Sequence, residues 1–224
     1  RAALLFAGRI PSVREVEEVR QGDAGILRAT IRQYMKGDNF REFLVRGVND
    51  RLLTESVTLN YDIPNFPISS QKTRDLAVSF GGQSQQVLDY QSQLGFSAFR
   101  AAGELVNHIA QEEKSYTEVV TADYMMMNPV MAEAMGATVT FEDRGNSLEF
   151  KPAPIEQYYQ SDEVVVDNCN IARHSGCDIL SLGTPTAVPL SGVLTDTAFL
   201  ERYPFTPTNR NRARAKAIFY HFLG

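Results

Sequence analysis

The spacing of apolar and polar positions predicts helices over the first 54 residues. Ser12 and Glu15 have the spacing of a capping box, in which each side chain satisfies a free backbone N–H at a helix start. Asp23 has the position of a second N-cap, and the apolar residues that follow it share one helical stripe. Gly37 breaks this helix and starts a third. We therefore expect residues 1–54 to form a helical N-terminal unit.

The middle of the chain combines an irregular segment with helices. Residues 55–83 carry two closely spaced prolines, so we expect an irregular excursion containing one short helix. The helical period returns over residues 83–113. Asn128 is an N-cap that Pro129 follows at the first helical position, and Gly136 is placed to end this short helix. The positions of the 83–113 helix expected to face the core are Phe96, Phe99, Leu105 and Ile109.

Between Ala137 and Lys151 the apolar period changes to two. Polar and apolar residues alternate on both sides of a turn-forming segment at residues 143–147, which is typical of a β-hairpin. Pro152 and Pro154 end this pattern. The sequence therefore predicts that residues 55–154 form a helical domain with an irregular excursion and a terminal β-hairpin.

Residues 155–224 are expected to combine a disulfide loop with a C-terminal helix. A short strand is expected at Val164–Val166, a short helix near Asp196, and a final helix from about Thr208. The predicted fold class is mainly α with a small β-hairpin, an irregular helical assembly stapled by one local disulfide.

Both cysteines of the chain lie in one short loop. Cys169 and Cys177 are separated by seven residues that include a glycine, so the loop can close easily, and we interpret the pair as a disulfide. A disulfide implies an oxidising compartment. Two free thiols in a cytosolic loop are the alternative. A metal site would need more cysteine or histidine ligands than His174 supplies.

Composition and charge exclude several classes of protein. Hydrophobic residues make up 43% of the chain and charged residues 22%, which excludes a disordered or collagen-like protein. The 22 Lys and Arg against 27 Asp and Glu give a net charge of −5, which argues against general nucleic-acid binding. The apolar runs are too short to form a transmembrane segment.

The common catalytic motifs are missing from the sequence. Glycine-rich nucleotide loops, the zinc-protease HExxH pattern, the nucleophile elbow of hydrolases and the EF-hand loop are all absent. Whether the chain is an enzyme is therefore uncertain, and no catalytic residue is identified.

Glu104, His108 and Glu112 are weak candidates for a metal half-site. Their spacing of four places them on one helix face, and carboxylates with an imidazole suit iron or zinc. We prefer an exposed polar stripe with pairs four residues apart, because no second motif supplies matching ligands. The methionine-dense segment 125–135 offers sulfur that can bind haem iron, but methionine more often fills an irregular core.

The last predicted helix carries a group of cations beside aromatic residues. These cations suit an acidic partner surface or haem propionates, with internal salt bridges as the alternative. The four candidate contact residues are Arg210, Arg212, Arg214 and Lys216.

Three parts of the chain resemble domains of planctomycete-type cytochrome c proteins. The segment Tyr116–Tyr124 (YTEVVTADY) is similar to a signature of one such domain. Gly192–Thr195, followed by Thr208–Arg214 (TNRNRAR), resembles the next domain in those proteins. The helical domain that precedes them is similar to Ala3–Pro11, Phe40–Leu44 and Asn49–Thr54.

The resemblance implies a secreted or periplasmic bacterial protein from families of unknown function. In many of their members a CxxCH haem-attachment segment lies close to the helix that Arg210–Phe222 resembles. This chain contains no CxxCH, so the implied c-type haem would lie on a continuation or a partner chain. The implied partners are a haem-bearing domain or other protein subunits.

The function expected first is that of an extracytoplasmic scaffold domain or subunit of a c-type cytochrome (electron-transfer) assembly, not itself catalytic. One alternative is a structural subunit of a larger envelope or filament complex, which predicts large apolar surfaces at both termini. Another is a secreted degradative enzyme, with its substrate pocket lined by Tyr158, Tyr159 and the acidic residues around the cysteine loop. These are Asp162, Glu163, Asp167 and Asp178.

Overall fold

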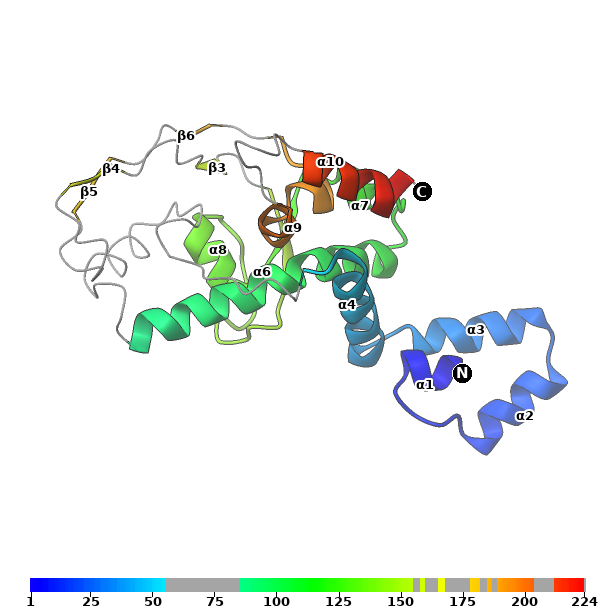
Figure 1. Cartoon of the computed structure of the whole chain (residues 1–224). Coiled ribbons are helices and arrows are strands. Elements are labelled where there is room, and N and C mark those ends of the chain that lie inside the picture. Colours follow the sequence, from blue (N-terminus) through cyan, green and yellow to red (C-terminus); the bar gives the residue numbers. More distant parts are fainter. Residues whose placement is uncertain are drawn as a thin grey trace.

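The computed structural model describes residues 1–54, 85–154, 158–159, 165–167, 178–181, 185–186, 189–203 and 212–223. These residues are mainly helical, as the sequence predicts (Figure 1). The helices before the first strand are α1 (Ala2–Phe6), α2 (Val13–Gln21), α3 (Ala24–Tyr34), α4 (Asp38–Leu52), α6 (Gln85–Gln111) and α7 (Glu118–Thr121). Those after it are α8 (Pro129–Met135), η2 (Gly192–Thr195), α9 (Thr197–Arg202), α10 (Arg212–Ile218) and η3 (Phe219–Leu223).

The predicted helix starts are confirmed by the hydrogen bonds of their caps. Ser12 and Glu15 form the complete capping box of α2. The carboxylate of Asp23 accepts from two backbone N–H groups at the start of α3. Asn128 accepts from the Met131 N–H at the start of α8, and Gly136 ends that helix in the left-handed conformation with φ of 65°.

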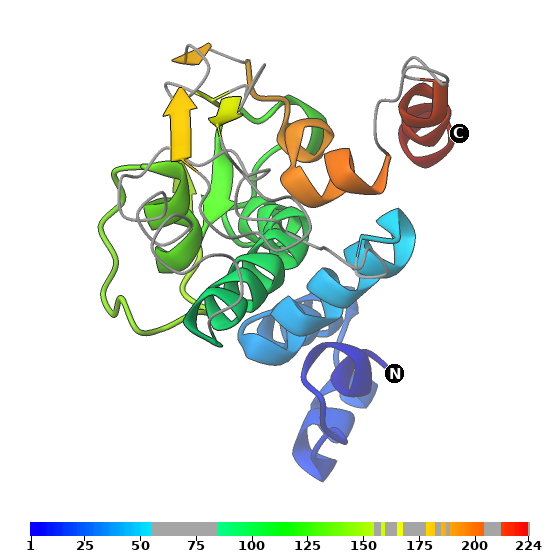
Figure 2. The same ribbon diagram turned by 60° about the vertical axis from the view of Figure 1, so that its left-hand side comes forward.

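The N-terminal helices lie at one end of the molecule, and α4 connects them to the long helix α6 (Figures 1 and 2). The crossing of α4 and α6 is close because Gly103 faces the backbone of Val45. A Cβ atom at Gly103 would lie only 2.6 Å from the Val45 Cα. Phe40 and Leu52, at the two ends of α4, are also buried. The absence of a side chain at one position therefore sets how near the two helices come.

A small antiparallel sheet is present, but the predicted hairpin at 137–151 is wrong. Residues 137–150 form no strand, and Lys151–Ala153 (β2) pairs instead with Met125–Met127 (β1), with Met126 opposite Pro152. The backbone N–H groups of Glu142 and Asp143 donate to the side chain of Glu149. In a hairpin these N–H groups would instead pair with backbone carbonyls of the opposite strand. Proline is tolerated in β2 because both strands of a two-stranded sheet are edges.

Two further strand pairs lie in the last third of the chain. β3 (Tyr158–Tyr159) pairs with β6 (Pro185–Thr186), and β4 (Val165–Asp167) pairs with β5 (Asp178–Ser181), both antiparallel. The short strand predicted near Val164–Val166 is therefore confirmed. The strand pair β4–β5 immediately flanks the cysteine loop.

The methionine-dense segment forms the core of the molecule. Its five methionines are each at most 5% exposed, and they pack with small residues of α6. The interpretation of these residues as core is confirmed. They are Met125, Met126, Met127, Met131 and Met135.

Of the four positions of α6 expected to face the core, only the two nearer its C-terminal end are fully buried. Leu105 and Ile109 are buried, whereas Phe96 is 41% exposed and Phe99 is partly buried. The Arg100 guanidinium lies 5.5 Å from the centre of the Phe96 ring. Phe96 therefore covers a charged side chain instead of entering the core.

Several predictions fall on residues outside the described ranges. The irregular excursion at 55–83 lies there, as do Cys169 and Cys177, so the excursion and the disulfide stay predictions. The last helix is described only from Arg212. None of the helices in the described part of the chain is both long and apolar enough to cross a membrane.

Candidate functional site

A pocket of about 450 Å³ opens between α4, α6, β1 and the segment that leads into β2. Its wall is mixed in character. Charged groups come from Arg41, Glu104 and Lys151, an imidazole from His108, and an apolar surface from Met126 and Phe150. The pocket brings together elements that are up to 110 residues apart in the sequence, because residues 41 and 151 both line it.

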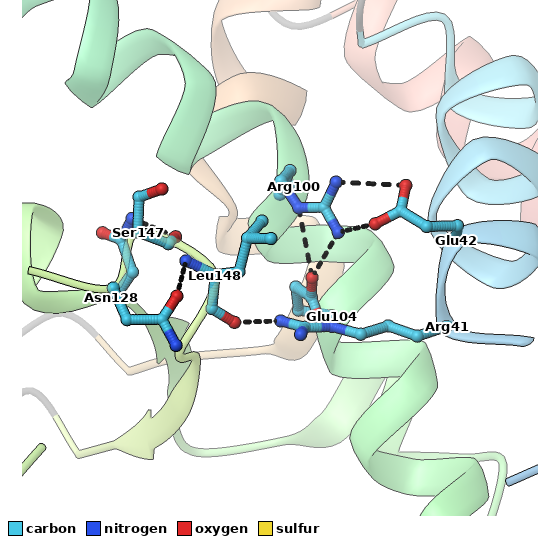
Figure 3. Close-up of polar contacts among 8 residues, drawn as sticks. Arg41, Glu42, Arg100, Glu104, Asn128, Ser147 and Leu148 are labelled. Atoms are coloured by element: carbon cyan, nitrogen blue, oxygen red, sulfur yellow. Dashed lines mark hydrogen bonds and ion pairs between the residues drawn. The ribbon is translucent and has the colours of Figure 1, made fainter. Parts of the chain in front are cut away.

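Glu104 lies at the centre of a buried ion-pair network beside this pocket (Figure 3). Its side chain is 2% exposed, and one oxygen accepts from the Arg41 Nε at 2.7 Å. The other oxygen accepts from Arg100 Nη2 at 2.9 Å and Nε at 3.2 Å. Arg100 also donates to Glu42 of α4 at 2.5 Å. Two arginines and two glutamates therefore join α4 to α6 with their charges balanced.

The same network fixes the loop that closes the pocket. Arg41 donates through Nη2 to the backbone carbonyl of Leu148. Next to it, the Asn128 amide donates to the Ser147 carbonyl at 2.9 Å (Figure 3). The buried N-cap of α8 and the arginine of α4 thus hold two successive carbonyls of one turn.

Glu149 holds the other side of this loop. Its carboxylate accepts from the N–H groups of Glu142 at 2.8 Å and Asp143 at 2.9 Å, and from the Lys151 ammonium at 2.8 Å. The bond from Lys151, followed by the two backbone N–H bonds, lowers the pKa of Glu149 to about 2. The carboxylate therefore stays charged and fully engaged at neutral pH.

The three weak metal candidates differ in their surroundings. Glu104 is buried between arginines, Glu112 is exposed, and His108 is half-buried with its ring edge-on to Tyr124. In the described part of the chain, no three His, Cys, Asp or Glu side chains lie close enough to hold a metal ion. The expectation of an exposed stripe is wrong for Glu104, whose pair four residues away is Arg100.

Burial favours the neutral form of the His108 imidazole. Burial lowers its pKa, and the nearby Lys114 ammonium lowers it further. No hydrogen bond from the imidazole to another described residue is present, although the ring lines the pocket. His108 is therefore a neutral donor and acceptor that faces the pocket.

Two of the segments that carry the family resemblance lie against each other. The N–H of Gly192 in η2 donates to the carbonyl of Ala122 at 2.8 Å. Gly192 has φ of 51°, and a Cβ atom there would lie 2.2 Å from the Val119 carbonyl oxygen. In the same region the Tyr124 hydroxyl donates to Glu118 at 2.8 Å. Both segments thus have packing roles in this chain.

The cations predicted on the last helix fall into two groups. Arg214 donates to the carbonyls of Tyr203 at 3.1 Å and Leu200 at 3.5 Å, so it holds the end of α9. Arg212 and Lys216 are exposed, and Arg210 lies outside the described residues. Arg212 and Lys216 are therefore the described cations that face solvent on this helix.

Large apolar side chains are exposed at both ends of the described chain. Phe219, Tyr220 and Leu223 are 64%, 67% and 70% exposed on η3. In the N-terminal helices the exposed apolar residues include Leu4, Leu5, Ile10 and Val13. These surfaces are where the chain can bury apolar area against another protein.

Sequence reasoning missed Arg41, Arg100 and Glu149 as organising residues. A signal exists for Arg100, because Arg100 and Glu104 are charges four residues apart in a stretch rich in alanine and leucine. A pair of opposite charges within such an apolar stretch of a helix indicates a buried ion pair. The role of Glu149 depends on a loop conformation that has no sequence signature.

Comparisons of this chain with family models, with curated proteins and with solved structures find no match.

Proposed function

We propose that this chain is a non-catalytic scaffold domain or subunit that docks onto a haem-bearing domain of an extracytoplasmic c-type cytochrome assembly. The observation that carries the proposal is a solvent-exposed stripe on the C-terminal helix, called here the C-terminal stripe. It consists of Arg212, Lys216, Phe219, Tyr220 and Leu223.

The C-terminal stripe has the composition of a protein interface. At helical spacing its five residues fall within roughly a third of the helix circumference. Aromatic residues and arginine are enriched in interfaces, and two cations at one end suit an acidic rim or haem propionates. The stripe therefore fits a partner that offers an apolar surface bordered by negative charge.

The opposite side of the same helix is anchored to the body of the protein. Ala217 is buried in one of the two core clusters, and Phe222 packs against that cluster. The Tyr203 hydroxyl donates to the Leu52 carbonyl at 3.1 Å and lies 3.0 Å from Nε2 of His221. Because the helix is already held, docking on its outer face costs little ordering entropy. This favours a preformed docking surface.

The strand pair beside the cysteine loop supports the predicted disulfide. Asp167 at the end of β4 lies opposite Asp178 at the start of β5. Cys169 follows the first by two residues and Cys177 precedes the second by one. The chain is thus brought together next to both cysteines, as a local disulfide requires. A disulfide would place the protein in the periplasm or outside the cell.

A structural subunit of a larger envelope or filament complex is the second candidate. The exposed apolar residues of the N-terminal helices favour it, since they add a second surface far along the chain from the C-terminal stripe. The two candidates differ in one property, which is the presence of haem in the intact assembly.

The test is a visible absorption spectrum with intact-mass analysis of the protein isolated from its native source. We expect a Soret band in the assembly and a gain of two hydrogen masses on reduction of Cys169 and Cys177. A colourless assembly would overturn the cytochrome proposal and leave the structural subunit. An unchanged mass on reduction would overturn the disulfide.

A further inference from the structure

We propose that the pocket between α4, α6 and the 142–151 segment binds a neutral, hydroxyl-rich ligand of the size of a mono- or disaccharide. This site is separate from the C-terminal stripe, which lines no part of the pocket, and the inference does not depend on the docking proposal. It rests on which groups in the pocket wall are already engaged and which are free.

Four charged residues of the pocket wall, called here the inner wall, are already paired. They are Arg41, Glu104, Glu149 and Lys151. Glu104 holds Arg41 and Arg100 with its two oxygens, and Glu149 holds Lys151 together with two backbone N–H groups. A charged ligand would have to displace one of these partners. The inner wall therefore favours a ligand without formal charge.

The free polar groups include one amide oxygen, that of Asn107, and the imidazole of His108. His108 makes no hydrogen bond to another described residue, and its lowered pKa keeps the ring neutral. The Asn107 Oδ1 atom is buried in the pocket wall without a hydrogen-bond partner among the described residues. The amide oxygen accepts a hydrogen bond, and a neutral imidazole both donates and accepts one. A ligand hydroxyl group can match each of these roles.

An apolar surface completes the wall. Met126, Leu148 and Phe150 line the pocket beside the polar groups, and the Arg41 guanidinium lies 6.0 Å from the centre of the Phe150 ring. A sugar ring has an apolar C–H face and a hydroxyl edge, so it can contact both kinds of surface at once. The volume of about 450 Å³ lies within the range of small-molecule sites, about 300–1,000 Å³.

A cationic ligand is the competing possibility. Glu142 and Asp143 also line the pocket, and they give its opening an excess of negative charge. One carboxylate oxygen of Asp143 is already used, because it accepts from the Gly145 N–H at 2.8 Å. Both acids are exposed, and solvent screens exposed charges strongly. Attraction at the opening is therefore weaker than the match of neutral groups inside.

The experiment is an NMR titration of the folded chain labelled with ¹⁵N in its histidine rings. The probes are glucose, N-acetylglucosamine and cellobiose, with glucuronate and glucosamine as charged counterparts. We expect a saturable shift of the His108 ring signals with at least one neutral sugar at millimolar concentration. Glucuronate and glucosamine are expected to bind more weakly than the matched neutral sugar.

Two variants and one control locate the site. His108→Phe and Asn107→Leu are each expected to weaken the binding of that sugar by roughly tenfold, the equivalent of one lost hydrogen bond. For Asn107→Leu the signals of His108 still report on binding, and His108→Phe is followed by calorimetry. Gln93→Ala, on an exposed part of α6 away from the pocket wall, is expected to leave the affinity unchanged.

Two results would overturn the proposed sugar site. One is that no neutral sugar shifts the His108 signals of the folded protein, and the other is that the shift survives Asn107→Leu unchanged. Tighter binding of glucosamine than of glucose would overturn the neutral ligand class, because the acids at the opening would then be decisive.

Discussion

Glu104 and Arg41 form an ion pair of 2.7 Å between α6 and α4 although the carboxylate is almost completely buried. Arg100 shares the same carboxylate, and Glu42 balances the charge of this second arginine. Buried charges are tolerated only while they are paired, so this network fixes the relative position of the two helices. Because Arg41 also holds the Leu148 carbonyl, the network positions the pocket as well.

Removing the central carboxylate is expected to destabilise the fold. Glu104→Gln leaves two arginines facing a neutral amide, and breaking a buried pair in this way costs about 3–5 kcal/mol in free energy of unfolding. Urea denaturation followed by circular dichroism measures the change. Glu18→Gln, which breaks the exposed pair with Arg14, should stay close to wild type. A small effect of Glu104→Gln would show that the network is not structural.

The same substitution in the two crossing helices should have opposite effects. A Cβ at Gly103 meets the Val45 backbone, so Gly103→Ala is expected to cost about 1–3 kcal/mol. A Cβ at Gly47, inside α4, meets nothing within 4 Å, so Gly47→Ala should stabilise by up to about 1 kcal/mol. Thermal denaturation of both variants compares them directly. Equal effects would contradict the close crossing.

Acid should release the loop that Glu149 holds. The pKa of Glu149 is lowered from 4.5 to about 2 in the folded state. Its contribution to stability is therefore complete above pH 4.5 and is lost as the pH falls toward 2. The stability of wild type minus that of Glu149→Gln, measured across this range, should fall with decreasing pH. A constant difference would mean that the carboxylate is not held as described.

Asp196 should give the opposite pH dependence. It caps α9 by accepting from the N–H groups of Ala198 and Phe199, but burial outweighs these bonds and raises its pKa from 3.8 to about 7. Between these values the folded state binds a proton that the unfolded state releases, so this contribution falls as the pH rises.

Asp196→Asn isolates this effect. Asparagine is an equally good N-cap and carries no charge, so the variant should fold normally. We expect wild type to lose stability relative to the variant as the pH rises from 3.8 to 7, measured by denaturant unfolding at several pH values. A difference that does not vary with pH would show that Asp196 is ionised in the fold.

Local signals in the sequence predict local structure correctly in this protein. The capping box at Ser12, the N-cap at Asp23 and the Asn128–Gly136 helix depend on residues near one another, and all are confirmed. The hairpin at 137–151 fails because alternation alone does not supply a partner strand. The true partner of β2 is Met125–Met127, which the sequence separates from it by a helix and a loop.

The pocket could not be predicted for the same reason. Its walls combine α4, α6 and the loop before β2, which only the tertiary fold brings together. The candidate residue His108 does line it, but the residues that organise it act through contacts with backbone groups. Arg41 donates to the Leu148 carbonyl, far along the chain, and Glu149 accepts from the Asp143 N–H within an irregular loop. Spacing along one helix identifies neither.

The most direct test of the docking account is co-purification of haem with variants of the C-terminal stripe. A tagged chain is isolated from its native host as wild type, Phe219→Asp, Leu223→Asp and the control Leu5→Asp, which changes an apolar residue exposed at the other end. The Soret absorbance per mole of tagged chain is measured. The account predicts haem with wild type and control, and a loss with both stripe variants. Haem retained equally by all four, or absent from all, would contradict it.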